Sequence, residues 1–390
     1  MICEGMNTEQ VLFALIRNVI CGEAVTEQVK NACTPELLEE VYALAHKHDL
    51  SHLAGQALSK LSLPECDGLK RMKTAVMQAV ARYVKLEHAY QCVCGVLEEA
   101  QIIFIPLKGA VLRQYYPEPW MRTSCDTDIL VHPEDLDRAA AVLEEKLHYR
   151  RTGHTPHDIT FQCPGGTHLE LHFDLVEDHR ANDACKILSD VWEHVMPGQG
   201  KQYQLEMTDT FFYFYHIAHM AKHFESGGCG VRPFLDLWIL ENKKAYHDDL
   251  DALLEKSNLM AFASASRKLS QMWLSGVEAD ADSRQFAHFI LTGGVYGSLE
   301  NGVRLQGKKT GGKWGYAMKR IFMPYDQLKH FYPILKKHRW MTPLFQLVRW
   351  CRVIFTGNMQ KAATELQANA ALSDGDSCAA HDLMNYLGLD

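Results

Sequence analysis

The chain has 390 residues, of which 47% are hydrophobic and 23% charged, and its formal net charge is -8. These proportions are typical of a globular protein with more than one structural unit, and they exclude an intrinsically disordered chain. No apolar run is long enough to span a bilayer, and the start MICEGMNTEQVLF lacks the basic residues of a signal peptide. We therefore expect a cytoplasmic protein with no membrane partner. Its twelve cysteines form no C-x-x-C pair, so we expect reduced thiols.

The charge is unevenly distributed along the chain. From Arg304 to Arg352 there are twelve lysine and arginine residues and one acid, Asp326. This basic segment could face an anionic substrate or be a solvated helical surface, and the sequence leaves both open. Its GKKTGGKW stretch resembles a P-loop, but Trp314 stands where a hydroxyl residue would bind Mg²⁺. We interpret it as a basic glycine loop. Because the remainder of the chain is acidic, we do not expect a dedicated nucleic-acid-binding protein.

Helices are predicted over residues 1–100. TEQVLFALIRNVI and TPELLEEVYALAHKH each place apolar residues at helical spacing, and Thr34-Pro35-Glu36 is a typical helix start. The stretch from Arg71 to Ala100 contains no proline and only one glycine, Gly95, so we predict one long helix. These features define an N-terminal helical region.

The pattern changes over residues 101–206. We predict, in chain order, a strand at Ile102–Ile105, a Gly turn at Lys108–Gly109, a helix from Ala110, a strand at Thr127–Val131, a helix after Pro133, and a hairpin of Ile159–Cys163 with His168–Leu175. This order predicts an α+β fold, with a small mixed sheet covered by helices on one side. Residues 207–390 are predicted to be helical again, with a loop at Ser373–Ser377 before a final short helix.

Acidic residues alternate along two of the predicted strands. Asp126 and Asp128 share one face because side chains two apart in a strand point the same way. In HLELHFDL, the side chains of His168, Glu170, His172 and Asp174 share a face in the same manner. If the two strands are neighbours, Glu170 joins the aspartates, although parity alone would also allow Asp174. Clustered carboxylates repel one another unless a cation lies between them, and Mg²⁺ prefers carboxylate and phosphate oxygens.

These motifs resemble the nucleotidyltransferase superfamily. Matching positions are Leu107-Lys108-Gly109, Arg122, Asp126, Asp128, Ile129-Leu130-Val131 and Glu170-Leu171-His172. The chain is most similar to a poorly characterised bacterial branch related to the aminoglycoside and lincosamide nucleotidyltransferases. The similarity extends through His219, Lys222 and His223 to Leu235-Asp236-Leu237.

The resemblance implies a specific reaction. Such enzymes transfer a nucleoside monophosphate from an NTP, such as ATP, to a hydroxyl and release pyrophosphate. Asp126, Asp128 and Glu170 would hold Mg²⁺ or Mn²⁺, and Glu170 could instead deprotonate the acceptor. Lys108, Gly109 and Arg122 would contact the nucleotide. One difference stands out: Gly109 is followed by Ala110, where many members carry a hydroxyl residue, and Lys108 could supply the phosphate contact instead.

The acceptor side is less defined. His172, His219, His223, Arg232 and Asp236 are candidates for a substrate pocket, and the acceptor could be a small molecule or a protein. Spacing also allows simpler interpretations. Arg232 and Asp236 are four apart and could form a helical ion pair, and the histidines from His216 to His223 could bind zinc. The alternative function is a catalytically silent scaffold that binds a nucleotide or a protein. The three acids favour the enzyme, since uncompensated carboxylates are costly to hold together.

Overall fold

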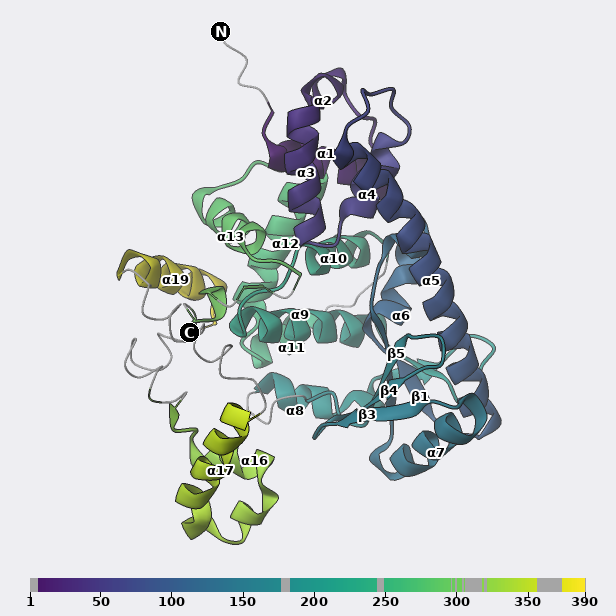
Figure 1. Ribbon diagram of the computed structural model, residues 1–390, viewed down its shortest axis with the longest axis vertical. Coiled ribbons are helices and arrows are strands. Elements are labelled where there is room, and N and C mark those ends of the chain that lie inside the picture. The colour runs from purple at the N-terminus through teal and green to yellow at the C-terminus, as the bar shows by residue number, and fades with distance from the viewer. Residues whose placement is uncertain are drawn as a thin grey trace. The chain divides into compact units, whose positions relative to one another are not determined.

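The structure is a computed structural model that describes residues 6–176, 183–243, 249–295, 297–298, 300–303, 305, 318, 321–355 and 374–389 (Figure 1). The chain forms two compact units. The first combines Met1–His219 with Val231–Asp280, and the second combines Met220–Gly230 with Ala281–Asp390. The division predicted at residues 100 and 206 separates helical from mixed segments and stays a prediction of domain organisation.

The N-terminal helices form where the sequence predicts them. They are α1 (Thr8–Ile20), α2 (Glu27–Ala32), α3 (Pro35–Lys47), α4 (Ser51–Leu58) and the 33-residue α5 (Asp67–Glu99). Thr34 caps α3 by accepting a hydrogen bond from the backbone N–H of Leu37, and Pro35 occupies the first turn. Helices α4 and α5 pack closely because Gly55 has no side chain: a Cβ there would lie 2.1 Å from the Met72 carbonyl oxygen.

A five-stranded mixed sheet follows α5. Its strands are β1 (Phe104–Pro106), β2 (Asp126–Val131), β3 (Arg150–His154), β4 (Asp158–Gln162) and β5 (His168–His172), in the order β1-β2-β5-β4-β3. Strands β2 and β5 are parallel, and the other neighbours are antiparallel. The predicted α+β fold and the β4–β5 hairpin are confirmed. The first strand begins two residues later than predicted.

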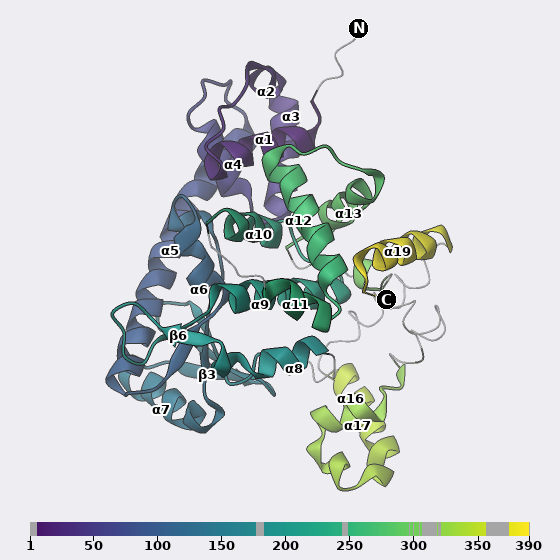
Figure 2. The ribbon, with the colours of Figure 1, turned by 180° about the vertical axis from the view of Figure 1, so that it is seen from behind.

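The edge strand β3 was not predicted. Its residues RRTGH are all exposed, so they carry no apolar alternation that could signal a half-buried strand. A second small sheet was also missed. It pairs β6 (Val195–Pro197), which Figure 2 labels, with β7 (Leu205–Met207). Gln204 bridges to Phe104 of β1, so this sheet adjoins the β1 edge.

The two faces of the main sheet differ in chemistry. One face is apolar and packs against α5 and α7 (Leu136–Leu147). Its core is formed by buried side chains of strands and helices, among them Ile129, Val131, Phe161, Leu169, Leu171, Val93, Leu97 and Leu143. The opposite face is polar and carries the acidic residues of β2 and β5. Helices cover this apolar face, as the sequence predicted.

The remaining elements are mostly helical, as predicted. They are α6 (Lys108–Leu112), α8 (Asp183–Ser189), α9 (Asp209–Glu225), α10 (Arg232–Lys243), α11 (Asp249–Lys256), α12 (Met260–Ser275), α13 (Ala281–Thr292), α16 (Tyr325–Phe331), α17 (Thr342–Phe355) and α19 (Asp374–Leu387). The predicted loop at Ser373–Ser377 is wrong from Asp374 onward, because that residue begins α19. The P-loop-like GKKTGGKW stretch lies outside the described residues.

Candidate active site

The sheet register brings the two acidic strands together. Asp128 of β2 lies directly opposite Glu170 of the parallel β5, and Asp126 lies opposite His168. Asp126, Asp128, Glu170 and His172 thus follow the polar face of two adjacent strands. Asp174 lies beyond the end of β5, where its Oδ1 accepts a hydrogen bond from the backbone N–H of Val176 at 2.8 Å. Of the two acids that parity allowed, the fold places Glu170 beside Asp128.

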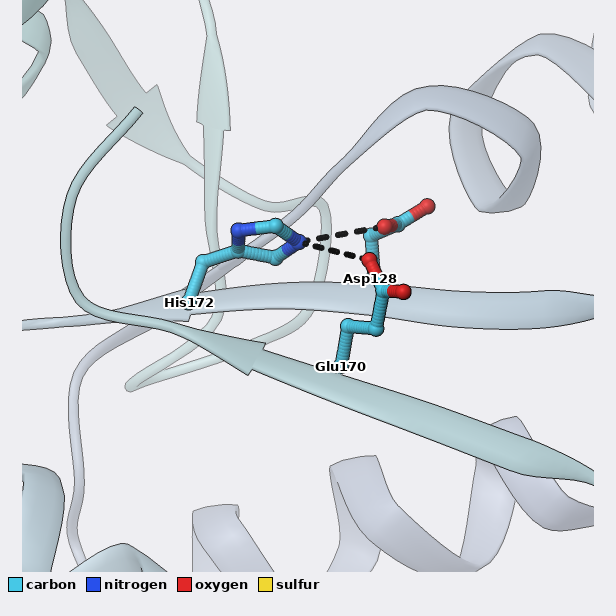
Figure 3. A group of neighbouring side chains, drawn as sticks. All are labelled: Asp128, Glu170 and His172. Atoms are coloured by element: carbon cyan, nitrogen blue, oxygen red, sulfur yellow. Dashed lines mark hydrogen bonds and ion pairs between the residues drawn. The ribbon is translucent and has the colours of Figure 1, made fainter. Parts of the chain in front are cut away.

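Asp128, Glu170 and His172 form a compact group of possible metal ligands (Figure 3). One ligand atom from each lies within 4.8 Å of the other two. His172 Nε2 is 3.1 Å from Asp128 Oδ1 and 3.4 Å from Glu170 Oε2, so the imidazole is shared between the carboxylates. The sequence assigned His172 to a substrate pocket, whereas the structure places it among the acids. We call Asp126, Asp128, Glu170 and His172 the acid cluster.

Burial and mutual repulsion separate the two aspartates. Burial raises the pKa of Asp126 to about 6, and the charges of Asp128 and Glu170 add to the effect. Burial would also raise the pKa of Asp128, but Lys108 and His172 outweigh it and hold that pKa below its usual range. His172 has a raised pKa despite its burial, because both carboxylates accept hydrogen bonds from it. Asp128 is therefore compensated by Lys108 and His172, contrary to the expectation from the sequence that the carboxylates are uncompensated, whereas Asp126 is still repelled by its acidic neighbours.

Lys108 is the main partner of Asp128 outside the cluster. Its ammonium lies 3.2 Å from Asp128 Oδ1, and the negative charges of Asp128 and Glu170 raise its pKa against the effect of burial. Its backbone φ is +41°, a left-handed conformation that non-glycine residues rarely adopt. Such strain persists only where the surroundings enforce it, and it is common at functional sites.

The predicted Gly turn differs in detail from the structure. Lys108, and not Gly109, has the left-handed conformation, and both residues belong to the short helix α6. Gly109 is needed for close packing: a Cβ there would lie 3.3 Å from Ser124 Oγ and 3.6 Å from an Arg122 nitrogen. Ser124 donates a hydrogen bond to the backbone oxygen of Asp126 at 3.2 Å, so this packing supports the start of β2.

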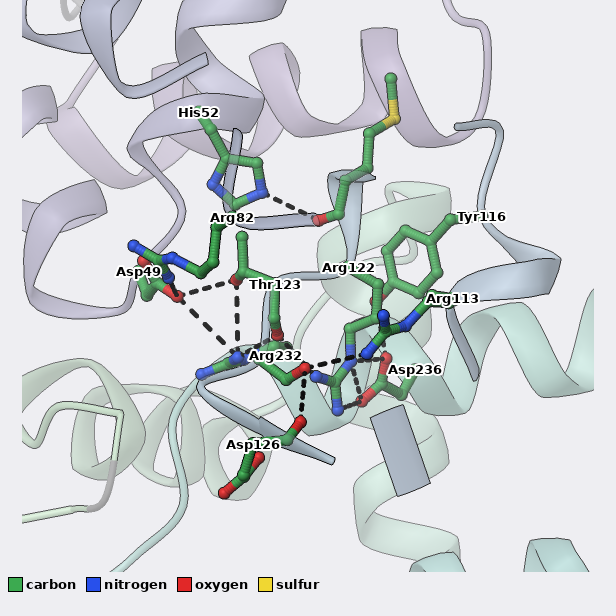
Figure 4. A network of polar contacts seen from close by, with 12 residues as sticks. Asp49, His52, Arg82, Arg113, Tyr116, Arg122, Thr123, Asp126, Arg232 and Asp236 are labelled. Carbon is green, nitrogen blue, oxygen red and sulfur yellow. Dashed lines mark hydrogen bonds and ion pairs between the residues drawn. The ribbon is translucent and has the colours of Figure 1, made fainter. Parts of the chain in front are cut away.

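Arg122 is held in a buried ion pair with Asp236 of α10 (Figure 4). Its Nε lies 2.9 Å from Asp236 Oδ1 and its Nη2 lies 2.9 Å from Oδ2, which is a bidentate geometry. The Tyr116 hydroxyl donates to the same carboxylate at 2.7 Å. Arg122 Nη1 also donates to the Thr123 carbonyl at 2.7 Å. Arg122 therefore ties the segment before β2 to α10, and its predicted contact with a nucleotide stays a prediction.

Arg232 does not pair with Asp236 along α10, so the predicted helical ion pair is wrong. Asp236 is engaged by Arg122, while Arg232 Nη1 lies 3.8 Å from Asp49 Oδ2 and donates to the Thr123 carbonyl (Figure 4). Thr123 Oγ1 donates to Asp49 at 2.7 Å. Spacing could not reveal these partners because they are far away in sequence. We call Arg122, Arg232, Asp49, Asp236 and Thr123 the arginine frame.

The histidines of α9 have separate environments. His216 is buried and its Nε2 bonds to the Pro233 carbonyl at 2.9 Å, and burial lowers its pKa. The ring of His219 packs at 6.0 Å from that of Tyr215, and His223 is half-buried in the second unit. Within the described residues, the metal-ligand group found is that of the acid cluster, not these histidines.

Three residues near the acid cluster were missed by the sequence reasoning. The charges of Lys108, Asp128 and Glu170 act on the buried phenol of Tyr215, whose pKa is raised mainly by burial. On β4, the buried Asp158 lies opposite His172 and pairs with His157 at 2.8 Å. The rings of His157 and His172 stack at 6.0 Å. The alternation of polar and apolar residues in D-I-T-F-Q could have placed Asp158 on the polar face of the sheet. Tyr215 carries no such signal, because its helix is rich in aromatic core residues.

The donor set of the acid cluster fits a hard divalent cation. Asp128 and Glu170 supply adjacent carboxylate oxygens, and Asp126 lies next to them on the same face. These are the ligands that Mg²⁺ and Mn²⁺ prefer, whereas the nitrogen of His172 suits softer transition metals. The acid cluster is therefore a candidate metal site in which Asp128 and Glu170 would supply the oxygen ligands.

A family comparison identifies the class of protein to which this mixed sheet belongs. Residues 35–274 match the model of a family described as "Uncharacterised nucleotidyltransferase", which is more than half of the chain. The chain therefore belongs to this family and is an enzyme that transfers a phosphorus-containing group. No curated protein and no solved structure matches the chain.

Proposed function

We propose that the protein transfers a nucleoside monophosphate from an NTP to a hydroxyl, with Mg²⁺ or Mn²⁺ as cofactor. The observation that carries this proposal is the register of β2 and β5, which sets Asp128 opposite Glu170 with Asp126 beside them. The bound cation would neutralise the triphosphate and stabilise the charge that develops during transfer. Family membership supports the reaction class, and the carboxylate oxygens support the choice of cation.

Each residue of the acid cluster has a proposed role. Asp126 and Asp128 hold the cation against the triphosphate. Glu170 completes the cation site or accepts the proton of the attacking hydroxyl. The raised pKa of Asp126 supports this assignment, because a carboxylate held close to two others gains most from an added cation. His172 keeps Asp128 and Glu170 close to each other through its shared Nε2.

Lys108, Gly109 and Arg122 are proposed to serve the nucleotide. Lys108 lies 3.2 Å from Asp128, and with a cation held by the acid cluster its ammonium would be available to donate to phosphate oxygens. Gly109 lets α6 approach Ser124 closely and thereby fixes the backbone that carries Lys108. Arg122 contributes positive charge near Asp126, although its guanidinium is bound to Asp236.

The acceptor is proposed to be a hydroxyl of a small molecule or a protein. Tyr215 and His219 of α9 are the described candidates for lining its site, and Arg232 and Asp236 extend the same hypothesis. His223 belongs to the second unit, and its predicted role in the acceptor pocket stays a prediction. Arg232 and Asp236 have partners in the arginine frame, so we assign them to the support of this site rather than to direct acceptor contact.

The test is a screen of the four common NTPs with Mg²⁺ and Mn²⁺, monitored by thermal melting and pyrophosphate release. Binding to the folded state alone raises the melting temperature by mass action. We expect a rise with metal plus at least one NTP, and its loss in Asp128→Asn. The matched control is Asp174→Asn, which removes a half-buried carboxylate outside the acid cluster. A wild-type protein that responds to no metal and NTP combination refutes the proposal.

A second candidate is a silent scaffold that binds a nucleotide or a protein partner. The compensation of Asp128 by Lys108 and His172 favours it, because such a cluster is stable without a metal. The same screen separates the two. NTP binding that raises the melting temperature without metal, and without pyrophosphate release, would support the scaffold.

A further inference from the structure

The helices at residues 321–352 form a small lobe with its own core, outside the family match. It consists of α16, the short turns Pro333–Lys336 and Arg339–Met341, and α17. Leu328 and Leu335 are fully buried. The rings of Tyr332 and Phe345 pack at 4.8 Å, so the inner face of α17 is already covered by the lobe itself.

Further contacts use the same inner face of α17. Trp350 Nε1 donates to the Ile321 carbonyl at 2.8 Å, and its ring packs at 5.3 Å from that of Phe322. Gln346 is buried and donates to the Met323 carbonyl. The residues Phe345, Gln346 and Trp350 therefore anchor the helix and define which side of it faces outward.

The outward side of α17 is also apolar. Trp340 is 78% exposed, Leu344 51%, Leu347 54% and Val348 42%. Leu344, Leu347 and Val348 are spaced three and four apart along α17, so they share one face of that helix. Trp340 lies in the turn Arg339–Met341 just before α17. We call these four residues the apolar ridge. Exposed large hydrophobic side chains are concentrated in and before this lobe. Of the fourteen in the described residues, nine lie between Met318 and Val348. A single exposed leucine is ordinary, but a contiguous apolar face marks an interaction surface.

The charge around the apolar ridge is mostly positive. Between Tyr325 and Arg352 the sequence has six lysine and arginine residues and one aspartate. Lys336, Lys337 and Arg339 precede the ridge, and Arg349 and Arg352 follow along α17. A surface of this charge binds an anionic partner, and the solvated helical surface that the sequence left open does not explain the apolar residues.

We propose that the lobe lies on an anionic lipid surface, with the apolar ridge inserted at the headgroup level. An amphipathic helix with exposed Leu and Val on one side, an exposed Trp in the turn before it, and Lys and Arg nearby is the pattern of an interfacial helix. None of the described helices is long and apolar enough to cross a membrane, and a helix that lies on the surface needs no such length. The expectation of no membrane partner considered only spanning segments.

Other anionic partners fit less well. A nucleic acid would be bound through charge and stacking, and it would leave Leu344, Leu347 and Val348 without a role. An acidic protein would need a groove into which the ridge inserts or a helix packed along it. A bilayer interface supplies both an anionic surface for the basic residues and an apolar layer for the ridge, so it accounts for all of the observed features.

The experiment is flotation of the full chain with phosphatidylcholine vesicles, with and without about 30% phosphatidylglycerol. We expect binding to the anionic vesicles at least about tenfold stronger than to neutral vesicles, and weaker binding in about 0.5 M NaCl. Leu344→Ser with Leu347→Ser should reduce binding by about tenfold or more, because two inserted side chains are lost. Lys336→Gln with Lys337→Gln should reduce it by a similar factor at low salt.

Matched controls are available on α5. Met77 and Val84 are 71% and 58% exposed, so Met77→Ser with Val84→Ser removes comparable apolar surface elsewhere. Lys70→Gln with Lys85→Gln removes the same charge from exposed sites. Both controls should bind as the wild type does, and all variants should retain its circular dichroism. Absent or charge-independent vesicle binding, equal losses in the controls, or vesicle binding unaffected by the leucine changes would overturn the proposal. Tighter binding to single-stranded DNA or polyglutamate than to vesicles would also overturn it and identify another class of partner.

Discussion

The acid cluster and the arginine frame are two groups of buried charge in one unit, and they are balanced differently. In the arginine frame, the carboxylate of Asp236 accepts hydrogen bonds from Arg122 and Tyr116. In the acid cluster, Asp128 is compensated by Lys108 and His172. An incoming cation could replace these compensating side chains, whereas loss of Arg122 would leave the buried Asp236 carboxylate with the neutral Tyr116 hydroxyl in place of its cation. The comparison distinguishes charge that fixes the fold from charge that is available for chemistry.

The largest effect is expected for Glu170→Gln. This change keeps the size of the side chain but removes the charge that holds a metal or accepts a proton. We expect nucleotidyl transfer to fall by about 10²–10⁴-fold, measured as pyrophosphate release with the NTP that the screen identifies. Asp174→Asn should lose far less, because Asp174 lies beyond the register of β5. A more severe effect in Asp174→Asn would mean that Asp174 is the third acid.

The next prediction compares how much the arginine frame and the acid cluster contribute to the stability of the fold. Asp236→Asn leaves the buried guanidinium of Arg122 without its partner, so the free energy of unfolding should fall by about 3–5 kcal/mol. Asp128→Asn should cost much less, because it also relieves repulsion with Asp126 and Glu170. Urea denaturation in the presence of EDTA measures both. Equal losses would show that the acid cluster is as structural as the arginine frame.

Lys108→Met should have two opposite effects. Removing the ammonium 3.2 Å from Asp128 should tighten Mn²⁺ binding in the absence of nucleotide, because the cation no longer competes with a protein charge. The same change should weaken NTP binding by about tenfold or more, since a charge-assisted contact to phosphate contributes roughly 1.5–3 kcal/mol. Isothermal titration of each ligand provides the measurement, with Lys85→Met as a control for the loss of an exposed lysine. If both affinities are unchanged, Lys108 serves neither ligand.

The smallest effect concerns His52 of α4, which bonds to the Met121 carbonyl at 2.8 Å just before the arginine frame. Burial lowers its pKa, so the folded protein holds it neutral while the unfolded chain binds a proton below about pH 6.5. Stability should therefore fall on acidification below that pH, by at most about 1.4 kcal/mol per pH unit. Comparing urea denaturation at pH 7.5 and 5.5, His52→Gln should show a shallower loss than the wild type. The exposed His46→Gln should not, and a slope unchanged in His52→Gln would contradict the assignment.

Much of the fold could be predicted because its signals are local. The cap at Thr34, the uninterrupted helix α5 and the alternation in β5 each depend on a few neighbouring residues. The edge strand β3 escaped prediction because an exposed strand needs no apolar alternation. The left-handed backbone at Lys108 escaped as well, since the glycine beside it is the residue that usually adopts this conformation.

The sequence by itself determined which side chains share a face, because strand periodicity places Asp126 with Asp128 and Glu170 with His172 whatever the rest of the chain does. Only the tertiary structure decided that β2 and β5 are neighbours with Asp128 opposite Glu170. It also decided that Asp236 pairs with Arg122, 114 residues away, instead of with Arg232 one helical turn away. The physical reason is that a buried charge takes the partner that the packing of distant elements brings into bonding distance, and spacing along one helix or strand carries no information about that partner.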